Sequence, residues 1–170
     1  MINEVKYFIK GKTVAIVGNA KSIFDTSHGA DIDAHDVVIR FNRGFIREPK
    51  AQGTKTDILV MACELSPEEL AQFGAKYVIN RTKKTKCGDY TFGDIERRRY
   101  RKKYDAYPST GFMAIDFCRK AGASKIDLYG FDFGATQTFY NPADYKTKHD
   151  YATEERLVHL LAGQGVLTIN

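Results

Sequence analysis

Residues 13–22 read TVAIVGNAKS, five strand-forming residues that lead into a glycine and an asparagine. The apolar positions do not alternate with polar ones, which is typical of a strand buried on both faces. Gly18 and Asn19 would place backbone amides and a side-chain amide at the carboxyl edge of a sheet, where open α/β sheets bind ligands. A tight turn without a binding role is the alternative, because neither a G-x-G-x-x-G fingerprint nor a P-loop is present.

Strand-like and helix-like segments alternate along the rest of the chain. Strands are predicted at residues 13–17, 37–41, 57–62, 76–80, 125–130 and 166–169. Helices are predicted at residues 67–73, 94–104, 109–121 and 150–162. This order predicts an α/β fold with a mostly parallel sheet and helices on both faces.

Length and composition fit one domain, residues 1–170, with 43% apolar residues to form its core. No apolar run approaches the roughly 20 residues of a membrane span, and the charged start MINEVKYFIKGK does not read as a signal peptide. We therefore expect a soluble, cytoplasmic protein. The cysteines, Cys63, Cys87 and Cys118, are widely spaced and odd in number, so we expect reduced thiols rather than a zinc site or disulfides.

One segment makes the protein basic. The net charge is +5, but residues 81–103 hold ten basic and three acidic residues, which leaves −2 for the remainder. Its densest part, RRRYRKK, begins at Arg97 and ends at Lys103 and could contact nucleic acid, an anionic membrane or a negatively charged substrate. A solvated helix face is the alternative. Aromatic residues interleave with the charges, but no nucleic-acid motif surrounds them.

Asn42 directly follows the strand predicted at residues 37–41, as Asn19 follows the first strand. The two side chains could jointly hold one anion, helped by Arg40 or Arg43. Turn formation is the alternative for either asparagine alone.

The sequence PSTG at residues 108–111 marks a predicted helix start. The amides and hydroxyls of Ser109, Thr110 and Gly111 suit a phosphate or a nucleobase edge, and simple helix capping is the alternative. Phe131 follows a later strand and could present its ring to a base or a sugar, or pack in the core.

The run HDYATEERLVHLL at residues 149–161 begins with a histidine just ahead of an amphipathic helix. Asp150 can cap this helix, and Glu154 lies near its positive end. A long loop, residues 134–148, leads to His149. This layout suits a positioned base, with an ordinary surface histidine as the alternative.

Taken together, in order and spacing, these segments resemble the sialylmotifs of glycosyltransferase family 29, the sialyltransferases. The large motif is matched by VAIVGNAKSIFDTSHGADIDAHDVVIRFNRGF with GTKTDILV, and the small motif by PSTGFMAIDFCRKAGASKIDLYGFDF. His149 and Glu154 match the H-x-x-x-x-E of the very small motif. The resemblance implies a short, soluble family member with a single-domain, Rossmann-like fold of the GT-A-variant type.

The same resemblance implies an inverting transfer of sialic acid, or of a related nonulosonic or Kdo-type sugar, from a CMP-sugar to a hydroxyl of a glycan or glycolipid. His149 becomes the general base, since an imidazole with a pKa near about 6.5 is partly neutral at working pH. Glu154 becomes a supporting residue. The implied donor-binding residues are Asn19, Asn42, Ser109, Thr110, Gly111, Phe131 and Tyr140. No metal and no cofactor are expected, and a peripheral membrane contact would use the basic run.

Two positions depart from the family pattern. Val14 stands where animal members have a cysteine that forms a disulfide with one in the small motif, to which Cys118 corresponds. The third motif reads TQTFYN, in which Gln137 or Thr138 occupies the place of a histidine. A catalytically silent nucleotide- or glycan-binding module of the same fold is therefore the alternative function. A nucleic-acid-binding domain built on the basic run is a third hypothesis.

Overall fold

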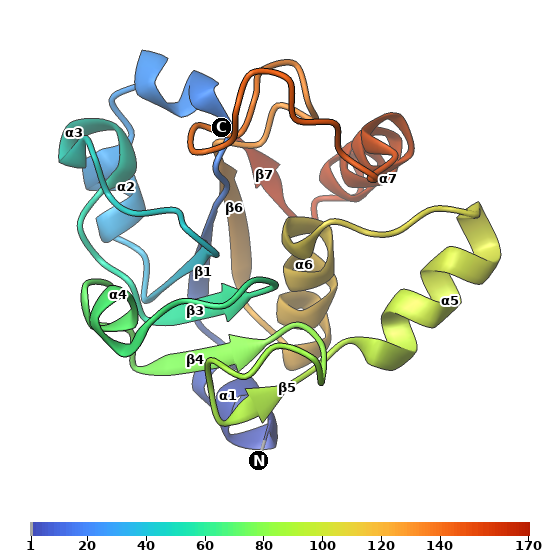
Figure 1. Ribbon diagram of the computed structural model, residues 1–170, viewed down its shortest axis with the longest axis horizontal. Coiled ribbons are helices and arrows are strands. Elements are labelled where there is room, and N and C mark those ends of the chain that lie inside the picture. Colours follow the sequence, from blue (N-terminus) through green and yellow to red (C-terminus); the bar gives the residue numbers. More distant parts are fainter. Residues whose placement is uncertain (1) are drawn as a thin grey trace.

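Parallel strands form the centre of the molecule, with helices on either side (Figure 1). The computed structural model describes residues 2–170. The strands are β1 (Thr13–Val17), β2 (Val37–Phe41), β3 (Ile58–Met61), β4 (Tyr77–Asn80), β5 (Tyr90–Thr91), β6 (Lys125–Tyr129) and β7 (Thr168–Ile169). The helices are α1 (Ile2–Ile9), the 3-10 helix η1 (Lys21–Asp25), α2 (Gly29–Asp33), α3 (Pro49–Gln52), α4 (Pro67–Ala71), α5 (Asp94–Tyr104), α6 (Thr110–Ala121) and α7 (Tyr151–Gly163).

The seven strands lie in the order β5-β4-β3-β2-β1-β6-β7, and every pairing is parallel. Strands β2 to β5 follow one another on one side of β1, and β6 and β7 lie on its other side. Such a reversal opens a crevice beyond the carboxyl ends of the two central strands. Gly18 and Gly130 follow β1 and β6 directly, and a Cβ on Gly18 would overlap the carbonyl oxygen of Gly130. Only glycine allows this close approach.

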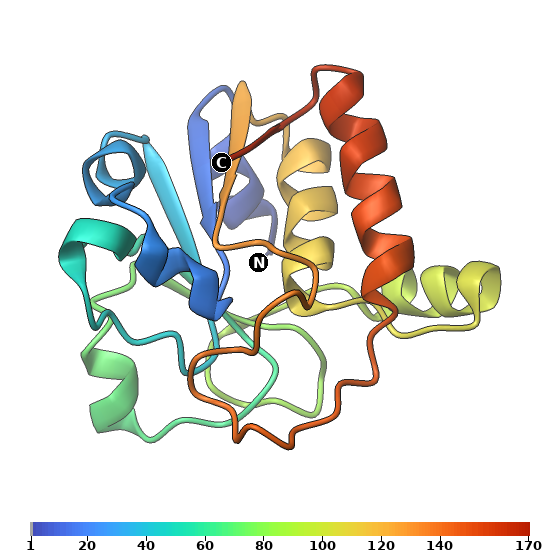
Figure 2. The same ribbon diagram turned by 90° about the horizontal axis from the view of Figure 1, so that it is seen from above.

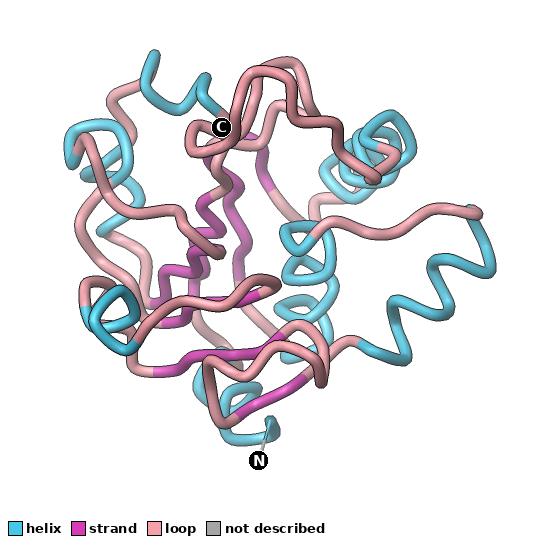
Figure 3. The backbone as a smooth tube through the Cα atoms, in the orientation of Figure 1, coloured by secondary structure: helices cyan, strands magenta, loops and turns pink. Residues whose placement is uncertain are grey.

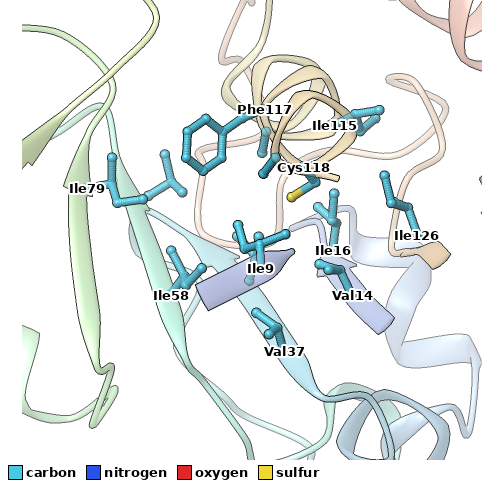
Figure 4. Packing of buried hydrophobic residues seen from close by; sticks show 14 of the residues in the cluster. Ile9, Val14, Ile16, Val37, Ile58, Ile79, Ile115, Phe117, Cys118 and Ile126 are labelled. Carbon is cyan, nitrogen blue, oxygen red and sulfur yellow. The ribbon is translucent and has the colours of Figure 1, made fainter. Parts of the chain in front are cut away.

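The main core lies on one face of the sheet, under α1, α6 and α7. Val14 and Ile16 of β1 point to this face and meet α6 through Phe117 and Cys118 (Figure 4). Val14 and Cys118 are the two positions at which the resemblance implies a disulfide in animal relatives, and apolar packing occupies both here. Burial raises the pKa of the Cys118 thiol, so it behaves as a small apolar side chain.

The other face carries two smaller clusters, so helices cover both sides of the sheet (Figure 2). Ala15 and Val17 of β1 alternate with the residues of the main core and meet Ile23 of η1 and Ile32 of α2. This continuous burial explains why the strand sequences are apolar throughout.

All six predicted strands and all four predicted helices are present, which confirms the fold class. Ser66 caps α4 in a capping box with Glu69, and Pro67 is the first helical residue. The sequence did not predict α1, the short helices η1, α2 and α3, or the two-residue strand β5. Figure 3 shows that a long loop, not a helix, joins β6 to α7.

Two expectations from composition can be compared with the structure. Cys63, Cys87 and Cys118 are all free thiols, as expected. From residue 2 to residue 170, no helix is long and apolar enough to cross a membrane.

Candidate active site

A pocket of about 800 Å³ lies at the carboxyl edge of the sheet. Its walls are the residues that follow β1, β2, β3, β4 and β6, the start of α6, and the loop between β6 and α7. The pocket is lined by all nine site residues selected from the sequence: His149, Glu154, Asn19, Asn42, Ser109, Thr110, Gly111, Phe131 and Tyr140. The fold therefore brings the three sequence motifs to one site.

Asn19 and Asn42 join the ends of neighbouring strands. The Asn19 side-chain amide donates to the carbonyl oxygen of Phe41 at 3.0 Å, and Asn42 Oδ1 accepts from the backbone amide of Ala62 at 2.7 Å. Asn42 adopts the left-handed backbone conformation, with φ of 50°, which asparagine tolerates better than most residues. Turn formation and pocket lining are thus combined in the same residues.

Tyr140 reaches these asparagines from the long loop. Asn19 Nδ2 lies 3.5 Å from the Tyr140 hydroxyl. Burial raises the pKa of Tyr140 to about 12, although hydrogen bonds with Asn19 and Asn42 act in the opposite direction. The hydroxyl therefore keeps its proton at neutral pH and can donate a hydrogen bond.

The expectation that Arg40 assists the asparagines is wrong. Arg40 is a strand residue that is 1% exposed, and it points away from the pocket into the layer beside α3. Its guanidinium donates to the carbonyl oxygens of Gln52 at 2.7 Å and Lys55 at 3.0 Å. Arg43, which lies beyond the strand, does line the pocket and pairs with Glu69 at 2.9 Å.

The start of α6 is held by Ser109, which acts as its N-cap. Ser109 Oγ accepts from the backbone amide of Phe112 at 3.1 Å, so the capping alternative is correct for this residue. Thr110 and Gly111 form the first turn, where backbone amides have no carbonyl partner within the helix. These amides, which line the pocket, can still bind an anion.

Glu154 of α7 binds this helix start rather than His149. Its two carboxylate oxygens accept from the Ser109 amide at 2.5 Å and from the Ser109 hydroxyl at 2.6 Å. The side chain is 3% exposed, and this burial raises the pKa of Glu154 to about 7 despite the two hydrogen bonds. Glu154 therefore fixes α7 against the start of α6.

His149 is half-buried, and one ring nitrogen is already occupied. Nδ1 lies 2.9 Å from the carbonyl oxygen of Tyr107, which can only accept, so Nδ1 carries the proton and Nε2 has a lone pair. Nε2 has no hydrogen-bond partner among residues 2–170. Burial, and then the charge of Arg81, lower the pKa of His149. The imidazole is thus neutral at pH 7, as a proton acceptor requires.

Tyr107, which orients the imidazole, is itself in contact with the basic helix α5. The guanidinium of Arg101 stacks on the Tyr107 ring at 4.7 Å from its centroid. The basic segment therefore packs against the side chain of the residue whose carbonyl oxygen orients His149.

The loop between β6 and α7 is folded over the pocket by its own hydrogen bonds. Asp132 Oδ2 accepts from the hydroxyls of Ser22 at 2.7 Å and Thr136 at 2.5 Å. Thr138 pairs with Ala20, and Gln137 donates its side-chain amide to the carbonyl oxygen of Ala143. Of the two candidates for the position of the missing histidine, Gln137 uses its side chain within the loop, whereas Thr138 is held through its backbone against Ala20, and both line the pocket.

Phe131 packs against the start of α6. A Cβ on Gly111 would lie 2.7 Å from Cε1 of the Phe131 ring, so glycine is required for this contact. The ring is only partly buried and lines the pocket. It contributes to the core and to the site at once.

Sequence reasoning missed Arg81 and Cys63, which also line the pocket. Arg81 directly follows β4, just as Asn42 follows β2, so the rule that selected the asparagines could have selected it. Its guanidinium lies 3.5 Å from the carbonyl oxygen of Pro108, close to the start of α6.

Comparisons with known proteins give a consistent result. The family model described as glycosyltransferase family 29 (sialyltransferase) matches residues 9–94, just over half of the chain. A mammalian sialyltransferase structure superposes with a TM-score of 0.68 at 18% identity, over 99% of this chain and 78% of the other. The sialyltransferase CstII from Campylobacter jejuni in complex with CMP-3FNeuAc gives a TM-score of 0.64 at 12% identity, over 93% of this chain and 80% of the other.

No curated protein sequence matches the chain significantly. The family match covers the segments that build Asn19, Asn42 and Arg81 into the pocket, and the structural matches extend the likeness to the whole fold. The chain belongs to glycosyltransferase family 29, the sialyltransferases.

Proposed function

We propose that the protein transfers sialic acid, or a related nonulosonic or Kdo-type sugar, from a CMP-sugar to a hydroxyl of a glycan acceptor, with inversion. The observation that carries the proposal is the state of His149. Its Nδ1 proton is fixed on the Tyr107 carbonyl, which leaves a basic Nε2 in a pocket lined by the family motifs. Solved sialyltransferase structures with CMP and with a trisaccharide acceptor support the choice of ligands.

In the proposed step, His149 Nε2 takes the proton of the acceptor hydroxyl. The acceptor oxygen forms a bond to the anomeric carbon of the donor, and the bond from that carbon to the CMP phosphate oxygen breaks. The electron pair leaves on the phosphate, and attack from the opposite face inverts the anomeric centre. The imidazolium then returns its proton to solvent.

The donor would lie against Asn19, Asn42, Tyr140 and the first turn of α6. Amides and a protonated phenol can stabilise the charge that develops on the leaving phosphate. Within residues 2–170, no three His, Cys, Asp or Glu side chains are grouped to share a metal ion. We propose a transfer that uses neither metal nor cofactor, because the single phosphate of CMP carries less charge than the two phosphates of a nucleotide diphosphate.

Glu154 would act as a positioning residue. It holds Ser109, and through it the amides of Thr110 and Gly111, in place for the donor phosphate. An acceptor on an anionic membrane would meet the exposed side of α5, where Arg98 and Arg99 face solvent.

A catalytically silent binding module is the second candidate. It is favoured by the loop that carries TQTFYN, because no histidine stands at Gln137 or Thr138 and the side-chain amide of Gln137 is used in a contact within the loop. This module would bind CMP without releasing it from a CMP-sugar.

CMP release from CMP-sialic acid, with and without a panel of glycan acceptors, separates the two candidates. The wild type should release CMP, and His149→Ala should do so at least about 100-fold more slowly. His159→Ala is the matched control, because His159 is an exposed histidine farther along α7. CMP binding without turnover by the wild type, or equal rates for wild type and His149→Ala, would contradict the proposal.

A further inference from the structure

A second hollow, of about 950 Å³, adjoins the pocket on the side of β4 and α5. The two share Ala62, Cys63 and Arg81 in their linings, so they are continuous at these residues. None of the nine site residues selected from the sequence lines the second hollow. It is therefore separate from the expected donor site.

The second hollow is lined by more basic than acidic side chains. The charged residues on its walls are Arg81, Lys83, Lys84, Arg97 and Arg98, against Glu64, Asp94 and Glu96. Helix α5, which carries the basic run, thus forms one wall of the second hollow and also has a side exposed to solvent.

Arg81 and Arg97 are the members of this lining that have a buried side-chain nitrogen without a partner among residues 2–170, although Nη1 of Arg81 lies 3.5 Å from the carbonyl oxygen of Pro108. The Nε atom of each is buried and has no hydrogen-bond partner in the described chain, and neither arginine forms a salt bridge there. Burial, and then the charge of Arg97, lower the pKa of Arg81, so the two cations oppose each other. Two buried donors without an acceptor cost stability unless a ligand satisfies them.

Arg81 also connects this hollow to the proposed base. It lines the pocket that contains His149, and its charge is one of the causes that lower the pKa of that histidine. A ligand group held between Arg81 and Arg97 would therefore lie where the second hollow meets the pocket that contains the base.

We propose that the second hollow is an acceptor subsite, in which Arg81 and Arg97 bind an anionic group of an acidic glycan. The planar guanidinium matches the two oxygens of a carboxylate or a sulfate. The inference rests on the proposed function, because it assigns the class of acceptor that the same site would use.

Calorimetric titration with three sugars in the presence of CMP tests this assignment without requiring turnover. Lactose is the neutral probe, sialyllactose adds a carboxylate, and lactose 3′-sulfate adds a sulfate. The wild type should bind at least one acidic sugar about tenfold or more tightly than lactose. The tighter of the two identifies the anion.

Arg81→Gln and Arg97→Gln should each remove this preference, and Arg97→Gln, which does not line the pocket proposed for CMP, should leave the affinity for CMP unchanged. Arg99→Gln removes the same charge from an exposed position on α5 that lines neither hollow, and it should bind as the wild type does. Since Arg97 lies on the outer helix, its variant keeps the test valid if Arg81→Gln does not fold.

Three results would overturn the subsite: equal affinity of the wild type for all three sugars, an equal loss in Arg99→Gln, or a loss of CMP affinity in both arginine variants with the preference for acidic sugars intact. A protein that keeps the preference but shows no dependence of turnover on His149 would refute the proposed function and leave the subsite standing.

Discussion

Polar side chains at the two ends of the sheet differ in whether they have partners within the protein. Toward the amino ends of the strands, polar groups are paired: His35 Nε2 lies 2.7 Å and Lys125 Nζ 2.8 Å from Asp127 Oδ2, and Asp36 accepts from Thr13. At the carboxyl ends, His149 Nε2 and Arg81 Nε have no partner within residues 2–170.

This difference separates stability from function. A paired polar group in a buried setting is satisfied by the fold and stabilises it, whereas an unpaired group in a pocket is left for a ligand. Asp127 Oδ1, which is buried without a partner, is an exception at the amino side. At the carboxyl edge, the unpaired groups lie beside a pocket of ligand size.

The largest expected effect compares two half-buried histidines, His149 beside the pocket and His35 toward the amino ends of the strands. His149→Ala should lower the rate of transfer at least about 100-fold, because its free nitrogen takes part in the reaction. It should lower the melting temperature only slightly, because the fold loses a single hydrogen bond to the Tyr107 carbonyl. His35→Ala should do the reverse, with a lower melting temperature and an unchanged kcat for the folded fraction. Thermal unfolding and CMP release on the same samples measure both. A loss of activity in His35→Ala at a temperature where it is folded would contradict the assignment of His35 to stability and His149 to function.

Asp127→Asn should produce the next largest effect, a loss of about 3 kcal/mol in the free energy of unfolding at pH 7, because it weakens the hydrogen bonds that the buried carboxylate accepts from His35 and from the exposed Lys125. Burial opposes ionisation, but hydrogen bonds from Lys125 and His35 lower the pKa of Asp127. A lowered pKa stabilises the fold above the ordinary value of 3.8 and loses this effect as the pH falls through the folded pKa. Urea unfolding should show the full deficit of Asp127→Asn at pH 7 and a deficit that shrinks as the pH is lowered below 3.8.

Glu154 should show the opposite pH dependence. Its pKa is raised from 4.5 to about 7, so the folded state binds this proton more tightly than the unfolded chain does. Stability should therefore fall by roughly 2–3 kcal/mol as the pH rises from about 5 through about 7. Glu154→Gln can accept from the Ser109 amide at every pH. Urea unfolding should therefore show that the free energy of unfolding of this variant does not decrease between about pH 5 and about pH 7 in the way that it does in the wild type. An identical pH dependence in wild type and variant would show that Glu154 does not titrate there.

The smallest effect is expected at Tyr140. Tyr140→Phe removes a hydroxyl that lies 3.5 Å from Asn19 Nδ2 and faces the proposed donor site. The loss of one neutral hydrogen bond of about 1 kcal/mol should raise the KM for the CMP-sugar about fivefold. Tyr7→Phe is the control, since Tyr7 is 82% exposed on α1. A change of more than a hundredfold would mean that Tyr140 takes part in the chemical step.

Much of the fold follows from the sequence because its signals are local. The strands are continuous apolar runs, and Ser66, Ser109 and Asp150 mark helix starts through their caps. The helices η1, α2 and α3 are only four or five residues long. Such short helices are not predicted by the periodicity of apolar residues, because they span little more than one turn. Strand β5 has only two residues and forms by pairing with β4.

The candidate site could be located for a similar reason. Residues that directly follow parallel strands meet at one edge, which brings Asn19 and Asn42 together. The prediction for Arg40 was wrong because this residue lies inside β2 rather than after it. Its side chain points to the face of the sheet beside α3 and does not reach the pocket. Arg81 was missed because it was counted only as part of the basic segment, residues 81–103. Its position directly after β4 was the signal for a place in the pocket.

The most direct test of the account is a crystal structure of the protein with CMP. The account predicts that the phosphate lies against Asn19, Asn42 and the first turn of α6, with the space for the sugar facing His149 Nε2. CMP bound in the second hollow between Arg81 and Arg97, or anywhere away from the asparagines, would contradict the assignment of the carboxyl edge as the donor site.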